Sequence, residues 1–449
     1  MRGRERILTI LTESKFSLNL HHANPVILLS LLIAMILNVF GHLTYSWSNM
    51  VLELLNFLLQ TVLREDTHAP QEENRYIPHD IRTVHKKFNL EPSTQTFATC
   101  IRCCCTYALM SKKTTYPKRC TFMWYRGGKP CRQLLIRTIK SGSSRVCTPV
   151  QPFVVQNFNN FLAGLLSHLG MEEAMECSTR LNDKHQLWDI KDRTGITEMM
   201  GPDGKPFMDG LPRKELRLAW SLSVDWFNLH QNKMAGKKKS VGSIAMMLLN
   251  LPPTLCYKPE NLYVFGVIPG PREPSRDKIN HFLHPLMNFF LPTWKNGTWF
   301  TRMTEHHVGC LSCSVITVVV NDLLSARKII GFAGPTADHL CNLCWLSKSE
   351  KDNFDCKEWR SCTFEEYFDA VVQWCDAKSK KEQDQIFKQT GVQWSELLWL
   401  PYWDPTCFVV INGMHNLFLG LVQYHFRDLI VINKPANESL RKFNQAYVQ

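Results

Sequence analysis

The chain has 449 residues, of which 45% are hydrophobic and 20% are charged, and its formal net charge is +12. This length allows two or three domains with hydrophobic cores, and the composition is ordinary for a globular protein. The 17 cysteines do not indicate a secreted disulfide scaffold, because we find no secretory signal at the start of the sequence. The cysteines are better interpreted as reduced, metal-binding thiols of a nuclear or cytosolic protein.

The N-terminal part is apolar and predicts helices. Residues 26–37 are apolar except for Ser30, and residues 50–63 carry polar side chains on a helical repeat. A membrane span needs about 18–20 clean apolar residues, which is longer than the first run. We therefore expect residues 1–78 to form a buried helical hairpin followed by a polar linker. A membrane anchor through residues 26–43 is the weaker alternative.

The positive charge is concentrated in one stretch. Residues 81–150 contain fourteen Lys or Arg residues and a single acid, Glu91, so this stretch carries the whole excess charge of the chain. A block this basic is either solvated or bound to a polyanion, and nucleic acid is the usual one. We predict double-stranded DNA as the partner.

Cysteines are clustered in the same stretch. Cys100 and Cys103 form a CxxC pair, and Cys120 and Cys131 supply a second pair. Four thiolates from two arms are what tetrahedral Zn²⁺ requires, so residues 79–150 predict a zinc-ribbon-like module, with buried free cysteines as the alternative. The predicted phosphate contacts are Lys112, Lys113, Lys118, Arg119 and Arg126.

After a helical connector at residues 151–215, residues 216–345 alternate between apolar runs and breaker residues. The expected order is strand, strand, strand, helix, strand, helix. The runs are 216–226, 241–252, 260–271, 275–290 for the helix, and 314–324. This is the order of a ribonuclease-H-like mixed sheet, in which the first and fourth strands are neighbours.

Two aspartates close the first and fourth strands of that order. Asp225 and Asp322 each follow an apolar run, so their carboxylates would point into one crevice. Two such carboxylates repel unless a divalent cation lies between them, which predicts a Mg²⁺ or Mn²⁺ site. The alternative for either residue is that it caps a turn or helix.

A second metal-ligand group follows Asp322. His339, Cys341 and Cys344 form an HxCxxC segment, which is a candidate for half of a second zinc site. Residues 346–403 are rich in tryptophan and charge and predict a helical insertion. Residues 404–449 predict a strand and a helix that carries His415.

Several motifs in one order resemble the transposase of CACTA (En/Spm-type) DNA transposons, and the copies from mushroom-forming fungi most of all. The resemblance covers residues 79–425. The motifs are SVDWFN (223–228), NLPP (250–253), ENLYVFGVIPGPREPS (260–275), NDLLSARKIIGF (321–332), HLCNLC (339–344) and MHNLFLGL (414–421).

The resemblance implies a nuclear, DNA-cutting enzyme that acts on transposon terminal repeats, in some cases as a homo-oligomer, through two Mg²⁺ ions. Asp225 and Asp322 match its first two acids, whereas its third acid would lie beyond the MHN helix, so we expect a C-terminally truncated copy. Asn412 and Gly413 replace the acid and proline that usually precede MHN. A non-catalytic, zinc-dependent DNA-binding protein derived from a transposase is therefore the alternative, unless Asp404 or Asp428 completes the site.

Overall fold

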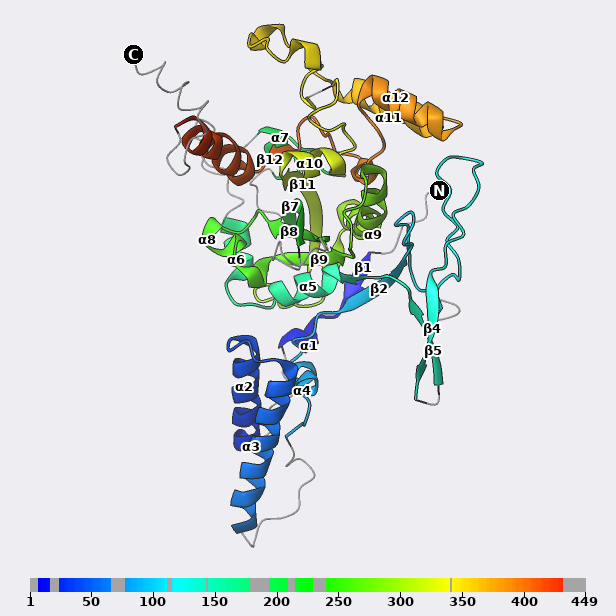
Figure 1. Ribbon diagram of the computed structural model, residues 1–449. Helices are drawn as coiled ribbons and strands as arrows, with labels where there is room; N and C mark the ends of the chain where they lie inside the picture. Colours follow the sequence, from blue (N-terminus) through cyan, green and yellow to red (C-terminus); the bar gives the residue numbers. More distant parts are fainter. Residues whose placement is uncertain are drawn as a thin grey trace, which may run out of the picture.

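A ten-stranded mixed β-sheet forms the centre of the protein (Figure 1). The computed structural model describes residues 7–16, 24–65, 77–110, 115–142, 144–177, 194–208, 215–228, 240–339 and 341–430. The strands follow one another across the sheet in the order β1-β10-β11-β7-β8-β9-β6-β2-β3, and β12 also pairs with β11. Their bounds are Leu8–Ile10 (β1), Thr298–Phe300 (β10), Cys310–Asn321 (β11), Glu215–Asn228 (β7), Ser240–Leu248 (β8), Tyr263–Ile268 (β9), Pro152–Gln156 (β6), Thr94–Thr99 (β2), Thr106–Tyr107 (β3) and Val409–Ile411 (β12).

The pairing of β7 with its neighbours sets the centre of this sheet. β7 runs parallel to β11 and antiparallel to β8, and β8 runs antiparallel to β9. The short strand β12 pairs in parallel with the last residues of β11. The expected adjacency of the strands that lead to Asp225 and Asp322 is therefore present.

The two faces of β7 differ because side chains alternate along a strand. Its even-numbered residues from Leu216 to Trp226 are large and apolar, and Trp220 packs edge-on against Phe158 of α5 (Phe158–Leu165) with ring centroids 5.4 Å apart. Phe158 also contacts Phe290 of α9 (Arg276–Lys295), so α5 and α9 cover this face. The odd-numbered residues Ser221 and Ser223 line a groove of about 1240 Å³ on the other face.

Helix α9 is longer than the predicted 275–290 segment. It continues to Lys295 although it contains Pro285 and Pro292, because its apolar face is buried against the sheet. It ends before Gly297, whose φ of 70° is the left-handed conformation that glycine adopts easily after a helix.

The strands β2 and β3, which flank Cys100 and Cys103, belong to the central sheet, whereas β4 and β5 form a separate two-stranded sheet. β6 pairs with β2, and Val155 of β6 pairs with Gly266 of β9. Gly266 permits this join, since a Cβ there would lie 2.8 Å from the Val154 carbonyl oxygen. β6 lies in the segment that we expected to be helical, where α5 is followed by α6 (Met171–Cys177) and α7 (Thr194–Thr197).

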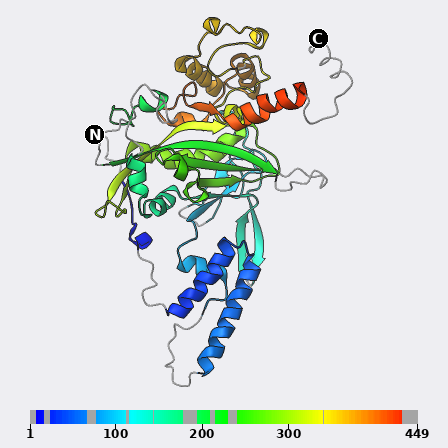
Figure 2. The same ribbon diagram turned by 90° about the vertical axis from the view of Figure 1, so that its left-hand side faces the viewer.

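The N-terminal helices form a hairpin that projects from the sheet (Figures 1 and 2). α2 (Pro25–Val39) and α3 (Tyr45–Glu65) pack with α4 (Ile81–Lys87), and the buried Asn56 amide bonds both backbone groups of Ile77. One face of the hairpin is buried, with Leu31 and Leu52 in its core, whereas outer residues such as Leu29 and Leu54 stay exposed because three helices cover only their inner faces. Among the described residues, no helix has the length and apolar character needed to cross a bilayer.

The predicted helical insertion is present at the opposite end of the molecule, in α11 (Phe364–Asp376) and α12 (Lys380–Thr390) (Figure 1). Thr363 and Glu366 form a capping box at the start of α11. After β12, the predicted MHN helix is present as π-helical turns, η7 (Met414–Val422) and η8 (His425–Leu429). The remaining elements are α1 (Glu13–Phe16), β4 (Ile136–Ser141), β5 (Ser144–Pro149), α8 (Pro253–Cys256), η3 (Pro259–Asn261), α10 (Leu323–Ile329), η4 (Lys348–Glu350), η5 (Cys356–Glu358) and η6 (Glu396–Trp399).

Candidate metal centre and nucleic-acid interface

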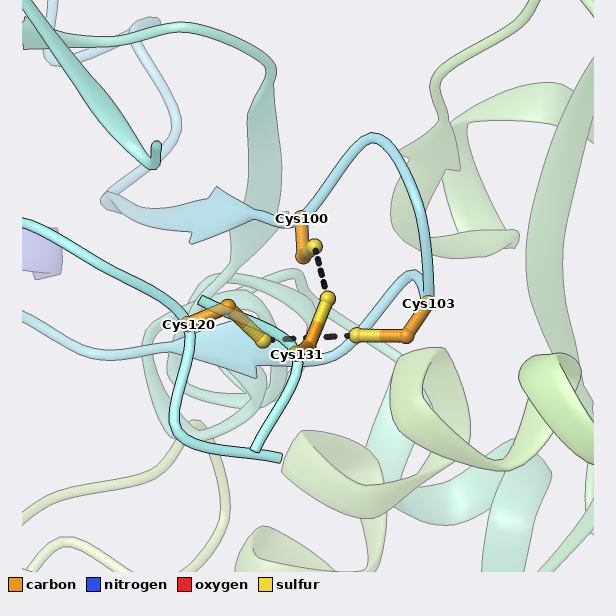
Figure 3. A group of neighbouring side chains, drawn as sticks. All are labelled: Cys100, Cys103, Cys120 and Cys131. Atoms are coloured by element: carbon orange, nitrogen blue, oxygen red, sulfur yellow. Dashed lines mark hydrogen bonds between the residues drawn. The ribbon is translucent and has the colours of Figure 1, made fainter. Parts of the chain in front are cut away.

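The four cysteines predicted as zinc ligands converge in the structure. Cys100, Cys103, Cys120 and Cys131 are all buried, and their sulfur atoms all lie within 4.8 Å of one another (Figure 3). The Cys100 and Cys131 sulfurs are 3.7 Å apart, and those of Cys103 and Cys120 are 3.4 Å apart. Tetrahedral Zn²⁺ with bonds of about 2.3 Å places its sulfurs about 3.8 Å apart, so this quartet could hold a metal such as zinc.

Two loops position the quartet. Cys100 follows β2 and begins a tight turn, in which the Cys104 N–H donates to the Cys100 carbonyl at 2.8 Å and Cys104 has a φ of 64°. The second loop is a hairpin that brings together cysteines eleven positions apart. Its closing bonds run from the Arg132 N–H to the Cys120 carbonyl at 2.9 Å and from the Cys131 N–H to the Phe122 carbonyl at 2.8 Å.

The hydrogen bonds at the sulfurs favour a bound cation. A hydrogen bond between the Cys103 and Cys100 sulfurs lowers the pKa of Cys100, and the backbone N–H groups of Cys103 and Arg102 act in the same direction. The same bond, together with burial, raises the pKa of Cys103, and burial raises that of Cys120. Thiolates are the metal-binding form, so a divalent cation would take the place of these shared protons.

The cysteine loops are fixed against helix α9 of the central fold. The Thr106 hydroxyl donates to the His281 carbonyl at 2.9 Å, and the Phe122 ring lies edge-on to the His281 ring at 4.6 Å. Burial lowers the pKa of His281 to about 4, so its ring is neutral at pH 7 and suits this apolar contact. Closing the metal centre therefore also holds the second loop on α9.

Exposed basic side chains lie in the second cysteine loop and just before it. Lys118, Arg119 and Arg126 are exposed, and the Arg119 guanidinium donates to the Arg132 carbonyl at 3.0 Å. Lys112 and Lys113, which we also predicted as phosphate contacts, lie outside the described residues. The antiparallel ribbon β4–β5 adds a second set of exposed cations, and it projects from the body in Figure 1. These are Arg137, Lys140 and Arg145.

The ends of three parallel strands meet at one side of the groove. Val319 of β11 pairs with Leu222 of β7 and with Val409 of β12. Three positions further along these strands come Asp322, Asp225 and Asn412. Side chains alternate between the two faces of a strand, and these three residues have the same parity as the groove-lining residues of their strands. They therefore fall on the face that carries the groove, and Asn412 lines it.

Each of these three side chains already accepts a hydrogen bond from a backbone N–H group. One oxygen of Asp225 accepts the Trp226 N–H at 2.8 Å. One oxygen of Asp322 caps α10 by accepting the Ser325 N–H at 2.6 Å. The Asn412 side-chain oxygen accepts the Met414 N–H at 2.8 Å and so begins the MHN helix. The capping role that we weighed for Asp322 is therefore real, and it uses only one of the two carboxylate oxygens.

No third acid joins Asp225 and Asp322 in the described part of the chain, where the cysteine quartet is the only converging group of three or more His, Cys, Asp or Glu residues. Asp404 is used in a turn, because it accepts the Thr406 N–H at 2.8 Å and the Thr406 hydroxyl at 2.7 Å. The side chain of Asp428 lies outside the described residues. The residue that the sequence analysis did not place at this site is Asn412, because only the pairing of β12 with β11 reveals its position.

The second cysteine group is only partly assembled. Burial and the neighbouring Cys341 sulfur raise the pKa of Cys344, and the Leu343 N–H donates to the Cys341 sulfur at 3.3 Å. His339 turns to Gln389, with its Nε2 atom 2.7 Å from that carbonyl oxygen. Since these three do not converge within the described ranges, the second zinc site stays a prediction.

Together these features define a mixed α/β protein with a buried four-cysteine centre and an open groove at the ends of its parallel strands. One model of a known family matches part of the chain. Residues 209–379 match the model described as Transposase family tnp2, which supports a transposase family for this region. The match includes Asp225, Asp322 and the second cysteine group, and lies outside the cysteine quartet and Asn412. No curated protein matches the chain.

The quartet gives the first prediction. We expect the full chain to contain about one zinc ion, measured by mass spectrometry of the purified protein, and Cys103→Ser to lose it because three ligands leave a structural site open. Cys147→Ser, an exposed cysteine of β5, is the matched control and keeps the metal. A Cys103→Ser protein that retained zinc would show that the quartet is not the site.

The strand ends give the second prediction. Asn412→Asp adds a carboxylate beside Asp322, so we expect Mn²⁺ to bind on the order of tenfold more tightly, because affinity rises with the number of charged ligands. Titration followed by electron paramagnetic resonance measures the free ion. Asn416→Asp, which adds the same charge in the exposed part of the MHN helix, is the control. Equal affinities for the two variants would contradict the placement of Asn412.

Proposed function

We propose that this protein is a transposase-like DNA-binding protein of the CACTA type, in which the cysteine quartet holds a structural zinc ion. The observation that carries the proposal is the transposase-family match over residues 209–379. DNA is the substrate class of transposases, and the most basic part of the chain lies next to the quartet. The nucleus is the compartment in which such a protein would meet its DNA.

The order of strands supports the ribonuclease-H-like part of this proposal. Along the path β9-β8-β7-β11-β12, the strands β7, β8 and β9 form an antiparallel meander, and β11 and β12 run parallel to β7. This is the arrangement expected for that fold, and it brings the ends of β7, β11 and β12 to one side of the groove. Catalytic groups in such sheets lie at the carboxyl ends of parallel strands.

The same strand ends support a loss of catalysis. In intact relatives, two Mg²⁺ ions would activate the attacking oxygen and stabilise the leaving oxygen of a phosphoryl transfer. Here Asp225 and Asp322 would hold one ion, and Asn412 supplies a neutral amide at the third strand end. A neutral ligand does not offset the repulsion between two cations. The second candidate function, a zinc-dependent DNA-binding protein without cleavage activity, is therefore the form that we propose for this chain.

Two exposed basic elements are available for the DNA backbone. One is the loop that carries Lys118, Arg119 and Arg126. The other is the β4–β5 ribbon, whose two-stranded width fits the major groove of duplex DNA. Element-specific recognition of terminal repeats would need contacts to base edges, and the ribbon is the element best placed to make them.

The DNA proposal gives the third prediction. Changing Lys118, Arg119 and Arg126 together to Glu should weaken duplex binding and lower the slope of log Kd against log salt by about 0.9 for each lost phosphate contact. Fluorescence anisotropy at several salt concentrations measures both effects. The control changes Lys351, Lys357 and Lys378 to Glu, which alters the charge equally on the exposed insertion. Equal effects of the two triple variants would show that binding depends on net charge alone.

The proposed loss of catalysis gives the fourth prediction. The zinc-loaded chain should bind a duplex that carries the ends of its own element, yet show no strand cleavage with Mg²⁺ or Mn²⁺, since loss of electrostatic stabilisation costs orders of magnitude in rate. Denaturing gels of end-labelled DNA measure cleavage. Cleavage that disappears in the Asp225→Ala variant would prove the chain to be an active nuclease and would overturn this part of the proposal.

A further inference from the structure

A pocket lined by aromatic side chains lies between the second cysteine loop and the helical insertion. It has a volume of about 450 Å³, and its two walls come from segments about 250 residues apart in the chain. The loop supplies Met123, Trp124, Tyr125 and Arg126, and the insertion supplies Trp374, Cys375, Gln383 and Trp394. Neither the metal centre nor the strand-end site uses these residues.

Contacts outside the pocket hold its loop wall. The Trp124 ring packs edge-on against Phe122 with centroids 5.6 Å apart, and Phe122 in turn rests on His281 of α9. The Arg102 guanidinium lies 5.4 Å from the centre of the Trp124 ring. Because Phe122 follows Cys120 in the zinc loop, the metal centre and this wall depend on each other.

Trp394 of the insertion wall is also held in place. The Trp394 indole N–H donates to Glu396 at 3.2 Å, and its ring lies edge-on to Trp399 at 5.7 Å. Glu396 is paired with His284 of α9 at 2.8 Å. The Trp124 and Trp394 sides of the pocket are therefore both anchored on α9 before any ligand arrives. A preformed site avoids the entropy cost of ordering its side chains on binding.

The chemistry of the walls selects the ligand. Indole and phenol rings bind flat aromatic groups by stacking, and a guanidinium beside them binds an anion such as phosphate. A cation such as trimethyl-lysine would suit the rings but would be repelled by Arg126. A nucleotide whose base is not paired offers both an aromatic face and a phosphate, and a pocket of this volume accepts one base.

We propose that this pocket binds an unpaired base of the DNA that the zinc loop contacts. The inference rests on the proposed DNA-binding function and specifies the substrate: a duplex with an unstacked or single-stranded nucleotide next to it. Stacking on the tryptophan rings then adds affinity that does not depend on sequence, since every base has an aromatic face.

The test uses the full chain and three labelled DNAs: a blunt duplex, the same duplex with a three-thymidine tail, and the same duplex with a tail of three abasic sugars. We expect the thymidine tail to tighten binding about tenfold and the abasic tail to add little, because stacking needs the base. Trp374→Leu should abolish the gain and leave blunt-duplex binding unchanged. Trp374→Phe, which restores an aromatic face, should recover most of it.

Trp359→Leu is the matched control, because this tryptophan of the same insertion does not line the pocket and bonds the Asn353 carbonyl. A thymidine gain that persists in Trp374→Leu, or an equal gain from the abasic tail, would overturn the inference while leaving the DNA-binding function intact. Failure of the wild-type chain to bind the blunt duplex would overturn the DNA-binding function as well. A trimethyl-lysine peptide that bound in place of the thymidine tail would assign the pocket to a protein ligand instead.

Discussion

The parallel pairing of β7 with β11 is the constraint on which the rest of the structure depends. It joins segments about a hundred residues apart, and the Asn321 side chain reinforces it by accepting the Val224 N–H at 3.3 Å. Once the register is fixed, side-chain parity sends Trp220 toward α5 and α9 and Ser221 and Ser223 toward the groove. A shift of one residue would exchange these faces and place large apolar groups in the groove, so burial of the apolar face specifies the register.

The metal centre depends on the same sheet. Cys100 follows β2, which reaches the central strands through β6 and β9, while Cys120 and Cys131 are carried by a loop that rests on α9. Zinc would therefore join two parts of one fold, the end of a strand and a loop held on a core helix. Metal binding and folding are linked in such sites, because the ligands come together only in the folded chain. The basic loop and the aromatic pocket are positioned by the same cysteine loop, so their geometry depends on the metal centre.

The groove and the metal centre point to different outcomes for the function. The quartet has four thiol ligands in good geometry, whereas the strand ends offer two carboxylates and the Asn412 amide. Binding to DNA needs only the first site, a positive surface and a stable fold. Phosphoryl transfer needs enough carboxylates at the strand ends to offset the repulsion between two cations. This is the part of the proposed function that the described residues do not provide.

The sequence by itself determined the features that depend on neighbouring residues. Apolar runs and breakers placed the strands that lead to Asp225 and Asp322, and the spacing of cysteines identified the quartet that the structure brings together. Only the tertiary structure decided which distant elements meet. It placed Asn412 beside Asp322, joined β6 to the central sheet, left the outer face of the N-terminal hairpin exposed, and formed a pocket from Trp124 and Trp374. Local sequence patterns show the periodicity and the ends of single helices and strands. Strand pairing and helix docking depend on burial summed over the whole chain, and no short segment carries that information.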